Sequence, residues 1–376
     1  MDELTAKLIL LRAPALSGAL YLRLLQTAGS AQAAVQTGPD LWHTIALPQR
    51  CIHFLQAPAS VDAERRWLEQ AGHHLLMLGD SNYPELLAQL PDAPLGLYVS
   101  GHIELLKQPQ LAIVGSRNPT PYGREAAEAF AKHLSQSGLT ITSGLAAGID
   151  AASHQGALQG MGSTLAVCGT GLDVIYPTSS KALATEISAN GALVSEFPPG
   201  TPPRRHHFPQ RNRIISGLSL GTLVVEAALH SGSLITARLA GEQGREVFAL
   251  PGSIHSPLSK GCHQLIRQGA KLVDSVADIL TELGPLAASL AQLSHAESSS
   301  EQTNLFDLPG FSEAPLDKDY EILLDALGFE AAGIDQLVAR SGLGADAVAS
   351  MLLILELNGQ VATSPGGRYV RLSQPQ

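Results

Sequence analysis

Leu111-Ala-Ile-Val-Gly-Ser-Arg117 is a short apolar run that ends in glycine, serine and arginine, and Ser143-Gly-Leu-Ala-Ala-Gly-Ile-Asp150 repeats that arrangement further along the chain. From residue 111 onward, short apolar runs of this kind alternate with segments of helical periodicity. Strands that alternate with helices are typical of a parallel sheet with crossover connections. The sequence therefore predicts an α/β fold with an extended Rossmann-like, doubly wound and mostly parallel sheet.

The predicted sheet contains a series of short strands joined by helices, of which Gly123–Gln136, Ile149–Gln159 and Leu234–Glu242 are examples. In sheets of this type, ligands bind beyond the carboxyl ends of the strands, which is where the glycine-rich turns lie. The expected strands are Leu111–Gly115, Leu139–Ser143, Thr164–Cys168, Ala192–Glu196, Thr222–Glu226, Val247–Ala249 and Lys271–Val273.

The sheet is expected to lie between two smaller units. Residues 1–80 show helical spacing of apolar residues and predict a small helical domain, SAM-like or helix-hairpin-helix-like. Residues 81–284 are assigned to the extended Rossmann-like domain. Residues 285–316 are rich in Ala, Ser, Gln and Glu and predict a linker, and residues 317–376 predict a winged-helix domain.

Neither flanking unit carries a strong DNA-binding signal. The segment Leu16–Gly29 has the rhythm of a small helix-turn-helix, but the Gly-x-Gly hairpin that would bind phosphate is missing, so a packing or spacer role is favoured. Three helices over Tyr320–Leu327, Gly333–Ser341 and Ala345–Asn358, then a hairpin over Gly359–Leu372, outline the winged helix. From Asp317 onward the sequence has eight Asp or Glu and four Lys or Arg, which gives a net charge of −4. This acidity favours a structural or protein-contact role over a grip on phosphate.

Composition limits the class of protein. The chain has 376 residues, 45% of them hydrophobic, a mean hydropathy of +0.11 and a net charge of −10. That charge argues against a protein that coats DNA through overall positive charge, so any anion site must be a local patch. Three cysteines without metal spacing argue against a disulfide framework. No signal peptide or membrane span is apparent, which indicates a cytoplasmic protein.

The turns after the first two strands have the groups that bind phosphate. Gly115 allows close approach of the backbone, Ser116 donates, and Arg117 adds a planar charged fork. Gly123 then opens a helix whose N-terminal dipole favours an anion. The alternative is an ordinary turn with an exposed arginine. The second turn offers Ser143, Gly144 and Gly148 in the same way.

Two nearby residues are given structural roles. Asp150 is expected to cap the helix that follows the second turn, and not to act in catalysis. His154 lies one turn further along that helix, and a single histidine in such a place is more often structural than a ligand.

A cluster of cations lies within ten residues: Arg204, Arg205, His206, His207, Arg211 and Arg213. Phe208 could stack on a base while Arg211 and Arg213, flanking Asn212, hold backbone phosphates. The alternative makes Phe208 a core anchor and the arginines surface groups. The turn Ser231-Gly232-Ser233 offers amides and hydroxyls at another helix start, and Glu226 is expected to hold Arg213 in place.

Several catalytic motifs are missing from the sequence. It has no P-loop, no Gly-x-Gly-x-x-Gly dinucleotide motif and no Gly-x-Ser-x-Gly nucleophile elbow. Cys262 stands beside His263, but no second pair of metal ligands follows at a usable spacing. The sequence therefore predicts a protein that binds and does not react, with no enzyme activity, no cofactor and no metal.

The turns together resemble the DNA-processing protein A (DprA/Smf) family. The stretches that carry the resemblance include Ile113–Arg117, Ser143–His154, Phe208–Gly217, Val225–Ala227 with Ser231–Ala237, and Val247–Gly252, preceded by Tyr83–Tyr98. The resemblance covers about residues 80–280 strongly and the flanks loosely. The residues that match the family's DNA pocket are Gly115, Ser116, Arg117, Ser143, Gly144, Gly148, Arg211, Asn212 and Arg213, with Ser231, Gly232 and Ser233 beside them.

The resemblance implies a homodimer that binds single-stranded DNA and loads the RecA recombinase onto incoming strands during natural transformation. Two other hypotheses remain. Gly221-Thr222 near Glu226 resembles the site of phosphoribohydrolases that act on nucleotides, although the denser Gly-Gly-x-Gly-Thr loop of those enzymes is missing. A transcription factor that acts through Asp317–Leu372 is disfavoured by the acidity of that unit.

Overall fold

The computed structural model describes residues 1–160, 164–284 and 286, and in the C-terminal part 323, 326–327, 332–344, 348, 351–352, 355, 361–364 and 368–371. The chain divides into two units, Met1–Glu297 and Ser298–Gln376, which are treated separately below. Of the described helices, none combines the length and apolar character needed to cross a lipid bilayer.

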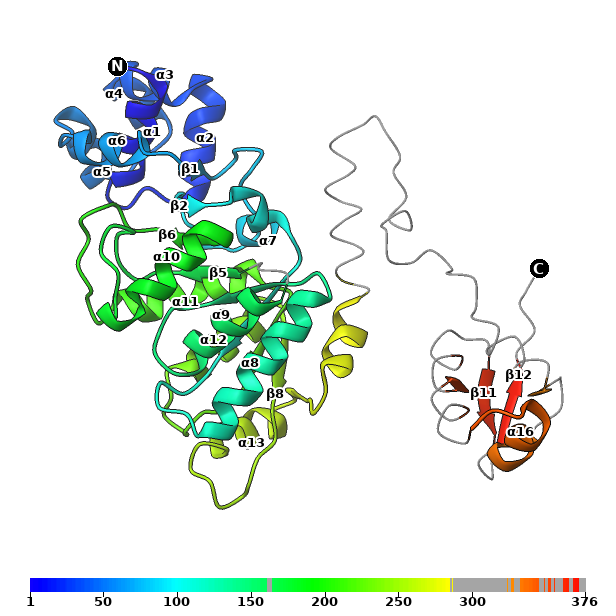
Figure 1. Cartoon of the computed structure of the whole chain (residues 1–376). Helices are drawn as coiled ribbons and strands as arrows, with labels where there is room; N and C mark the ends of the chain where they lie inside the picture. The colour runs from blue at the N-terminus through cyan, green and yellow to red at the C-terminus, as the bar shows by residue number, and fades with distance from the viewer. Residues whose placement is uncertain are drawn as a thin grey trace. The chain divides into compact units, whose positions relative to one another are not determined.

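The first unit is built on a nine-stranded sheet of order β1-β2-β6-β5-β4-β3-β7-β8-β9 (Figure 1). The strands from β3 to β9 pair in parallel, and their order reverses between β3 and β7, as in doubly wound folds. The predicted α/β class is confirmed, and the seven predicted strands are present with ends within two residues of expectation. They are β3 (Gln110–Val114), β4 (Thr140–Ser143), β5 (Thr164–Val167), β6 (Ala192–Ser195), β7 (Gly221–Val224), β8 (Glu246–Ala249) and β9 (Lys271–Leu272).

Two further strands extend one edge of the sheet. β1 (His73–Met77) pairs antiparallel with β2 (Gly96–Gly101), and β2 pairs antiparallel with β6. The prediction that residues 1–80 are helical throughout is therefore wrong at His73–Met77. This five-residue run has no alternation of apolar and polar residues, so its extended form depends on pairing with β2 and not on a local pattern.

Helices cover both faces of the sheet. In β3 the side chains alternate, so Leu111 and Ile113 face one core while Ala112 and Val114 face the other. The first core is closed by α8 (Pro121–Gln136) and α9 (Ile149–Gln159). The second is closed by α10 (Lys181–Asn190), α11 (His207–Leu218), α12 (Ser233–Glu242) and α13 (Lys260–Arg267). Shorter elements are α7 (Glu85–Ala88), η1 (Ile103–Lys107) and η2 (Thr178–Ser180).

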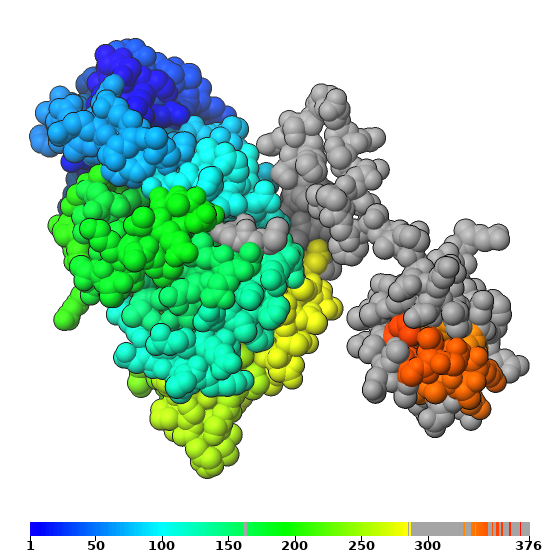
Figure 2. All heavy atoms as spheres, viewed as in Figure 1, coloured from blue at the N-terminus to red at the C-terminus, as the bar shows by residue number. Residues whose placement is uncertain are grey.

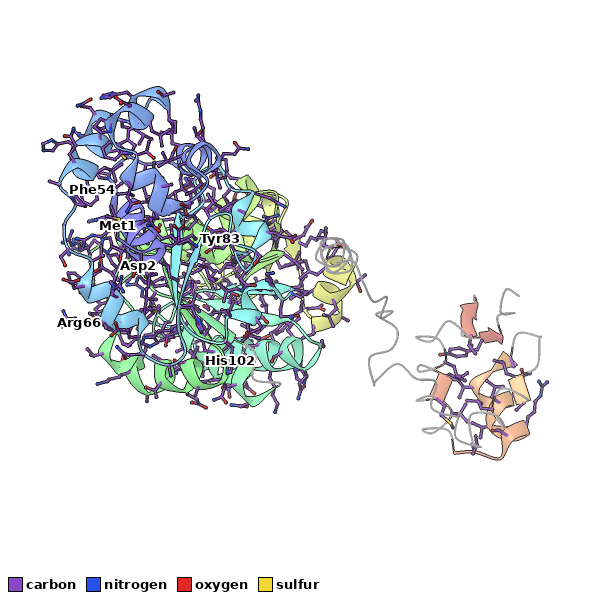
Figure 3. All side chains as sticks on the ribbon, turned by 90° about the horizontal axis from the view of Figure 1, so that it is seen from above. Met1, Asp2, Phe54, Arg66, Tyr83 and His102 are labelled. Atoms are coloured by element: carbon purple, nitrogen blue, oxygen red, sulfur yellow. The ribbon has the colours of Figure 1, made fainter. Side chains whose placement is uncertain are left out.

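The N-terminal helices pack as a small cluster that shares the second core. They are α1 (Glu3–Arg12), α2 (Gly18–Ala28), α3 (Ala31–Gln36), α4 (Pro39–Thr44), α5 (Gln49–Gln56) and α6 (Asp62–Leu68). The expected helix-turn-helix at Leu16–Gly29 is instead the single helix α2, capped by Ser17 and ended by Gly29 in the left-handed conformation. In Figure 2 these helices, in blue, rest on the cyan and green part of the chain. The buried Tyr83, whose hydroxyl donates to the Pro94 carbonyl at 2.7 Å, follows β1 (Figure 3).

The second unit contains one three-stranded antiparallel sheet, β10 (Ala332–Gly333), β12 (Arg368–Arg371) and β11 (Val361–Ser364), beside α16 (Ile334–Ser341). Leu323, Leu337 and Leu352 belong to its core. The helix predicted over Gly333–Ser341 and the C-terminal hairpin are confirmed, as expected for a winged helix. Apart from Leu286, the predicted linker 285–316 lies outside the described residues.

His154 has a structural position inside the first core. It is fully buried in α9, and its Nδ1 lies 2.7 Å from the Thr164 hydroxyl. That hydroxyl donates to the Ile141 carbonyl, so it accepts from the Nδ1–H of His154. Burial, with a contribution from Arg211, lowers the pKa of His154 to about 3, and the ring is neutral in the folded protein.

We predict that the buried neutral His154 makes the protein less stable in mild acid. Below a pKa of about 6.5 the unfolded chain binds a proton that the folded chain does not, so stability falls as the pH drops from about 6.5 toward 3. At pH 5 this loss amounts to about 2 kcal/mol. Denaturant unfolding at pH 7 and pH 5 should show that His154→Asn, which keeps a donor near Thr164, loses correspondingly less stability than the wild type. Equal losses in both proteins would contradict the prediction.

Candidate nucleic-acid interface

The loop after β3 turns sharply against α9. A Cβ at Gly115 would come within 2.6 Å of the Ile149 side chain, so the position requires glycine. The Ser116 hydroxyl accepts a hydrogen bond from the Asn118 amide at 3.1 Å, and the Ser116 carbonyl accepts one from the Ile149 amide at 3.1 Å. These bonds fix the loop and leave the Arg117 side chain exposed at its end.

The loop after β4 is tied to the same place. Gly148 has a φ of +86°, and a Cβ there would lie 2.6 Å from the Arg117 carbonyl oxygen. The Ser143 hydroxyl is fully buried and donates to the Ile113 carbonyl at 2.6 Å. Gly115, Ser116, Ser143 and Gly148 are therefore brought together, with the buried Ser143 hydroxyl bonded inside the protein.

Arg211 points into the sheet and not toward solvent. Its side chain donates to the Gly144 carbonyl at 2.6 Å and to the Val167 carbonyl, and the residue is only 5% exposed. Burial lowers the pKa of Arg211 and raises the pKa of Asp150, and the two charges oppose these shifts in each other. The prediction that Arg211 holds a backbone phosphate is wrong, because its buried guanidinium donates hydrogen bonds to carbonyls at the ends of β4 and β5.

Asp150 accepts from the Gly144 amide at 3.2 Å and the Ala146 amide at 3.4 Å. It lies inside α9, whose N-cap residue is Gly148, so it stabilises the preceding loop instead of capping the helix as expected. A Cβ on Gly144 would lie 2.5 Å from the Arg211 side chain, which explains the glycine at that position.

Arg213 forms ion pairs with two carboxylates. Its side chain is 13% exposed, lies 2.6 Å from Glu196 and 3.4 Å from Asp92, and does not contact Glu226 as expected. Residues two apart on a helix point about 200° away from each other, so Arg211 and Arg213 cannot share a face. The prediction that both grip phosphate is corrected for this reason. Asn212 between them is half-buried.

Glu226 instead holds Thr120, the N-cap residue of α8. Its two carboxylate oxygens accept from the Thr120 amide at 2.9 Å and the Thr120 hydroxyl at 2.6 Å, and that hydroxyl accepts from the Gly123 amide. The helix begins at Pro121 and not at Gly123. The anion predicted at this helix start is therefore the protein's own Glu226 carboxylate.

One exposed cation contacts an aromatic ring, and two more precede that ring in the sequence. The guanidinium of Arg117 lies 6.0 Å from the centre of the half-buried Phe208 ring. The ring of Tyr176, a residue that is 47% exposed, lies 5.6 Å from the Phe208 ring. Arg204 and Arg205 are exposed just before α11. We name these five residues the cationic face. The sequence shows the whole cluster of charges. Only the structure distinguishes the exposed Arg204 and Arg205 from the largely buried Arg211 and Arg213.

The turn Ser231-Gly232-Ser233 lies apart from these contacts. The Ser231 and Ser233 hydroxyls lie 2.7 Å from each other. Among the described residues, no hydrogen bond, ion pair or ring contact joins this turn to Arg117 or Phe208. Their place in a DNA site remains a prediction.

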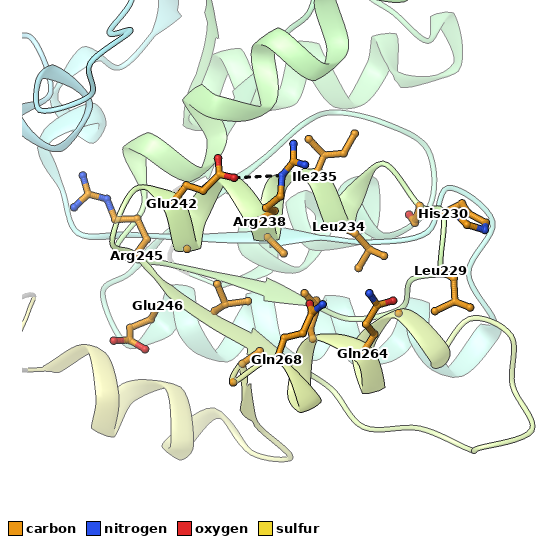
Figure 4. Close-up of a pocket in the computed structure, with 18 residues that line it drawn as sticks. Leu229, His230, Leu234, Ile235, Arg238, Glu242, Arg245, Glu246, Gln264 and Gln268 are labelled. Carbon is orange, nitrogen blue, oxygen red and sulfur yellow. Dashed lines mark ion pairs between the residues drawn. The ribbon is translucent and has the colours of Figure 1, made fainter.

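Ser231 instead lines a groove of about 780 Å³ between α12 and α13 (Figure 4). Leu229, Leu234 and Ile235 contribute apolar surface, and Arg238 pairs with Glu242 at 3.5 Å. Two arginines and two glutamates balance along the groove, so it does not attract phosphate as the cationic face does.

Metal ligands do not cluster in the part of the chain that the structure describes. Cys262, which stands beside His263, is buried with its thiol against the Val224 and Val225 carbonyls. Burial raises the pKa of its thiol to about 11.

Comparison with known proteins places the chain in a family. The model for DNA recombination-mediator protein A matches residues 74–284, and the model for the DprA winged helix domain matches residues 309–367. Protein Smf of Escherichia coli is 46% identical over 321 residues, covering 85% of this chain and 83% of that protein. DNA processing protein DprA of Streptococcus pneumoniae is 50% identical over 203 residues, covering 54% of this chain and 72% of that protein.

Solved structures agree with these matches. The X-ray structure of DNA processing protein A from Streptococcus pneumoniae has a TM-score of 0.65 at 38% identity, covering 75% of this chain and 99% of that one. A structure of DNA processing protein A from Helicobacter pylori, described for its single-stranded DNA binding mode, has a TM-score of 0.51 at 33% identity, covering 56% and 95%. The chain belongs to the DNA recombination-mediator protein A family.

Proposed function

We propose that this protein is a single-stranded DNA-binding recombination mediator without catalytic activity. The observation that carries the proposal is the cationic face, where the exposed Arg117 lies over the Phe208 ring and Tyr176 lies against that ring. Arg204 and Arg205 are exposed in the segment that leads into Phe208. Arginine holds backbone phosphate, and an aromatic face stacks on unpaired bases of any sequence. The single-stranded DNA binding mode described for the Helicobacter pylori relative supports the same ligand.

The charge distribution favours a strand that is gripped at one place. With a net charge of −10, the protein as a whole repels DNA, so binding depends on a local patch. In a duplex the bases stack on one another, which leaves Phe208 and Tyr176 without a base face to contact. The proposal therefore includes a preference for single strands over duplex.

The predicted site residues divide into two roles within this proposal. Arg117 and Phe208 contact DNA directly, with the backbone of Gly115 and Ser116 beside them. Ser143, Gly144, Gly148 and Arg211 hold the loops that position Arg117. Arg213 positions the start of α11 through Glu196, with Asn212 beside it, and the Ser231–Ser233 turn is kept as a more distant contact.

We further propose the partners that the family resemblance implies. The protein acts as a homodimer through its Rossmann-like domain and loads the RecA recombinase onto incoming single strands during natural transformation. Sedimentation of the full chain tests the dimer. RecA filament assembly on strands coated with single-strand-binding protein tests the loading, which should become faster when this protein is added.

The first experiment compares one labelled oligonucleotide as a single strand and as a duplex by fluorescence anisotropy. We expect clearly tighter binding of the single strand. Equal or tighter binding of the duplex would overturn the proposal. If neither form binds and a nucleoside monophosphate is hydrolysed, the phosphoribohydrolase hypothesis replaces it.

Arg117→Ala should weaken single-strand binding for all sequences alike. Each phosphate contact contributes about −0.7 to the slope of log affinity against log salt concentration for single strands, so the slope should become shallower by about that amount. Because Arg117 is exposed, thermal stability should stay unchanged. Anisotropy titrations over a salt series measure both effects, with Arg50→Ala on α5 as a control of equal charge. An unchanged salt slope in Arg117→Ala would remove this residue from the interface.

The buried and exposed arginines should give opposite results. Arg204→Ala with Arg205→Ala should weaken DNA binding and leave the melting temperature unchanged. Arg211→Met should lower the free energy of unfolding by about 3–5 kcal/mol, because it leaves Asp150 buried without its compensating charge. Thermal and denaturant unfolding, beside anisotropy, separate the two classes. A stable Arg211→Met variant that has lost DNA binding would restore Arg211 to the phosphate site.

A further inference from the structure

A second, smaller cavity of about 230 Å³ lies at the point where the strand order reverses. Its lining comes from the loop after β3, the loop after β7 and the segment after β8. Crevices at this position are where doubly wound sheets bind ligands. The volume is below the range of about 300–1,000 Å³ that drug-sized ligands occupy, so the cavity suits a fragment of about one ring system.

One polar group of this cavity has no internal partner. Ser259 is 7% exposed and lines the cavity, yet among the described residues its hydroxyl makes no hydrogen bond. The hydroxyl oxygen is not sealed inside the protein, so a ligand or water in the cavity can bond to it. Gly252 stands directly against this hydroxyl, and an added Cβ would collide with it. The Ser259 hydroxyl is thus kept accessible from the cavity.

The lining selects the chemistry of the ligand. None of the lining residues is Lys, Arg or His, while the Glu226 carboxylate is one of them, so the cavity disfavours phosphate. Each Glu226 oxygen already accepts one hydrogen bond from Thr120 and retains capacity for another. Val225, Leu250 and Pro251 supply apolar walls. The matching ligand is flat, largely apolar and neutral, and donates N–H to a carboxylate.

We infer that this cavity holds one base of the bound strand, a base that carries an exocyclic amino group. The amino group donates to Glu226, as carboxylates accept from the cytosine amine in DNA grooves, and the Ser259 hydroxyl donates to the neighbouring ring nitrogen, which is an acceptor in cytosine and carries a hydrogen in thymine. Thymine has an oxygen in place of the cytosine amine and so presents lone pairs to the carboxylate. This inference rests on the proposed function and adds a base preference to it.

The cavity is within reach of a strand held at the cationic face. Thr120 lines it and lies three residues after Arg117, a span of at most about 10 Å of extended chain. Tyr122, also in the lining, is 68% exposed, so its ring stands at the mouth of the cavity and is available to stack on the entering base. A phosphate on Arg117 and a base in the cavity can therefore belong to neighbouring nucleotides.

The test compares cytosine and thymine homopolymers of about 16 nucleotides by fluorescence anisotropy with the full chain in mildly alkaline buffer. The wild type should bind the cytosine strand about tenfold more tightly, which corresponds to about 1.4 kcal/mol. In Ser259→Ala this ratio should fall toward one, because only the Glu226 carboxylate still discriminates between the bases. The melting temperature should stay unchanged, since the lost hydroxyl has no partner inside the protein. Tyr122→Ala should weaken both strands by about fivefold and keep the ratio.

Ser219→Ala is the matched control, because Ser219 is also buried but its hydroxyl donates to the Ile215 carbonyl at 2.9 Å. It should lower the melting temperature and leave the base ratio at the wild-type value. A wild-type affinity ratio near one, or the same ratio in Ser259→Ala as in the wild type, overturns the inference and leaves the proposal of single-strand binding intact. Loss of binding to both homopolymers by the wild type would instead overturn the proposed function. Stabilisation by free cytidine without discrimination between the strands would assign the cavity to a nucleoside and overturn the strand subsite.

Discussion

The side chain of Arg211 reaches from α11 to the carbonyl oxygens of Gly144 and Val167, at the carboxyl ends of β4 and β5. These carbonyls lie where a parallel sheet stops pairing and would otherwise be buried without donors. Burying a cation is costly unless other groups compensate it, and here two carbonyls and the Asp150 charge do so. The loop after β4 depends on this contact, and Gly148 in turn fixes the loop that presents Arg117.

Five arginines of the first unit therefore have two different roles. Arg211 and Arg213 stabilise the folded chain from inside, whereas Arg117, Arg204 and Arg205 face solvent. Because the net charge is −10, overall attraction cannot bring an anion to this protein, and anion binding depends on where the exposed cations lie. The buried pair holds the scaffold rigid, and a rigid scaffold lets a few exposed charges and two rings act together without a large ordering cost.

Glu226 gives the reversal point of the sheet a character unlike that of a dinucleotide-binding fold. In such folds the start of the helix after the first strand binds a pyrophosphate. Here Thr120 and the Glu226 carboxylate already satisfy the start of α8. The same carboxylate makes the neighbouring cavity acidic, which distinguishes the exposed cation at Arg117 from a cavity that suits a hydrogen-bond donor.

The sequence by itself determined the α/β class, seven strands of the sheet and the winged helix, because apolar periodicity and glycine turns are local signals. It also predicted a site at the carboxyl ends of β3 and β4. Tertiary structure alone decided that His73–Met77 forms a strand, since that strand exists through its pairing with β2. It also decided which arginines are free, because the direction of a side chain depends on the face of α11 that the sheet covers. A run of cations in a sequence reports charge, whereas burial reports whether that charge is available to a ligand.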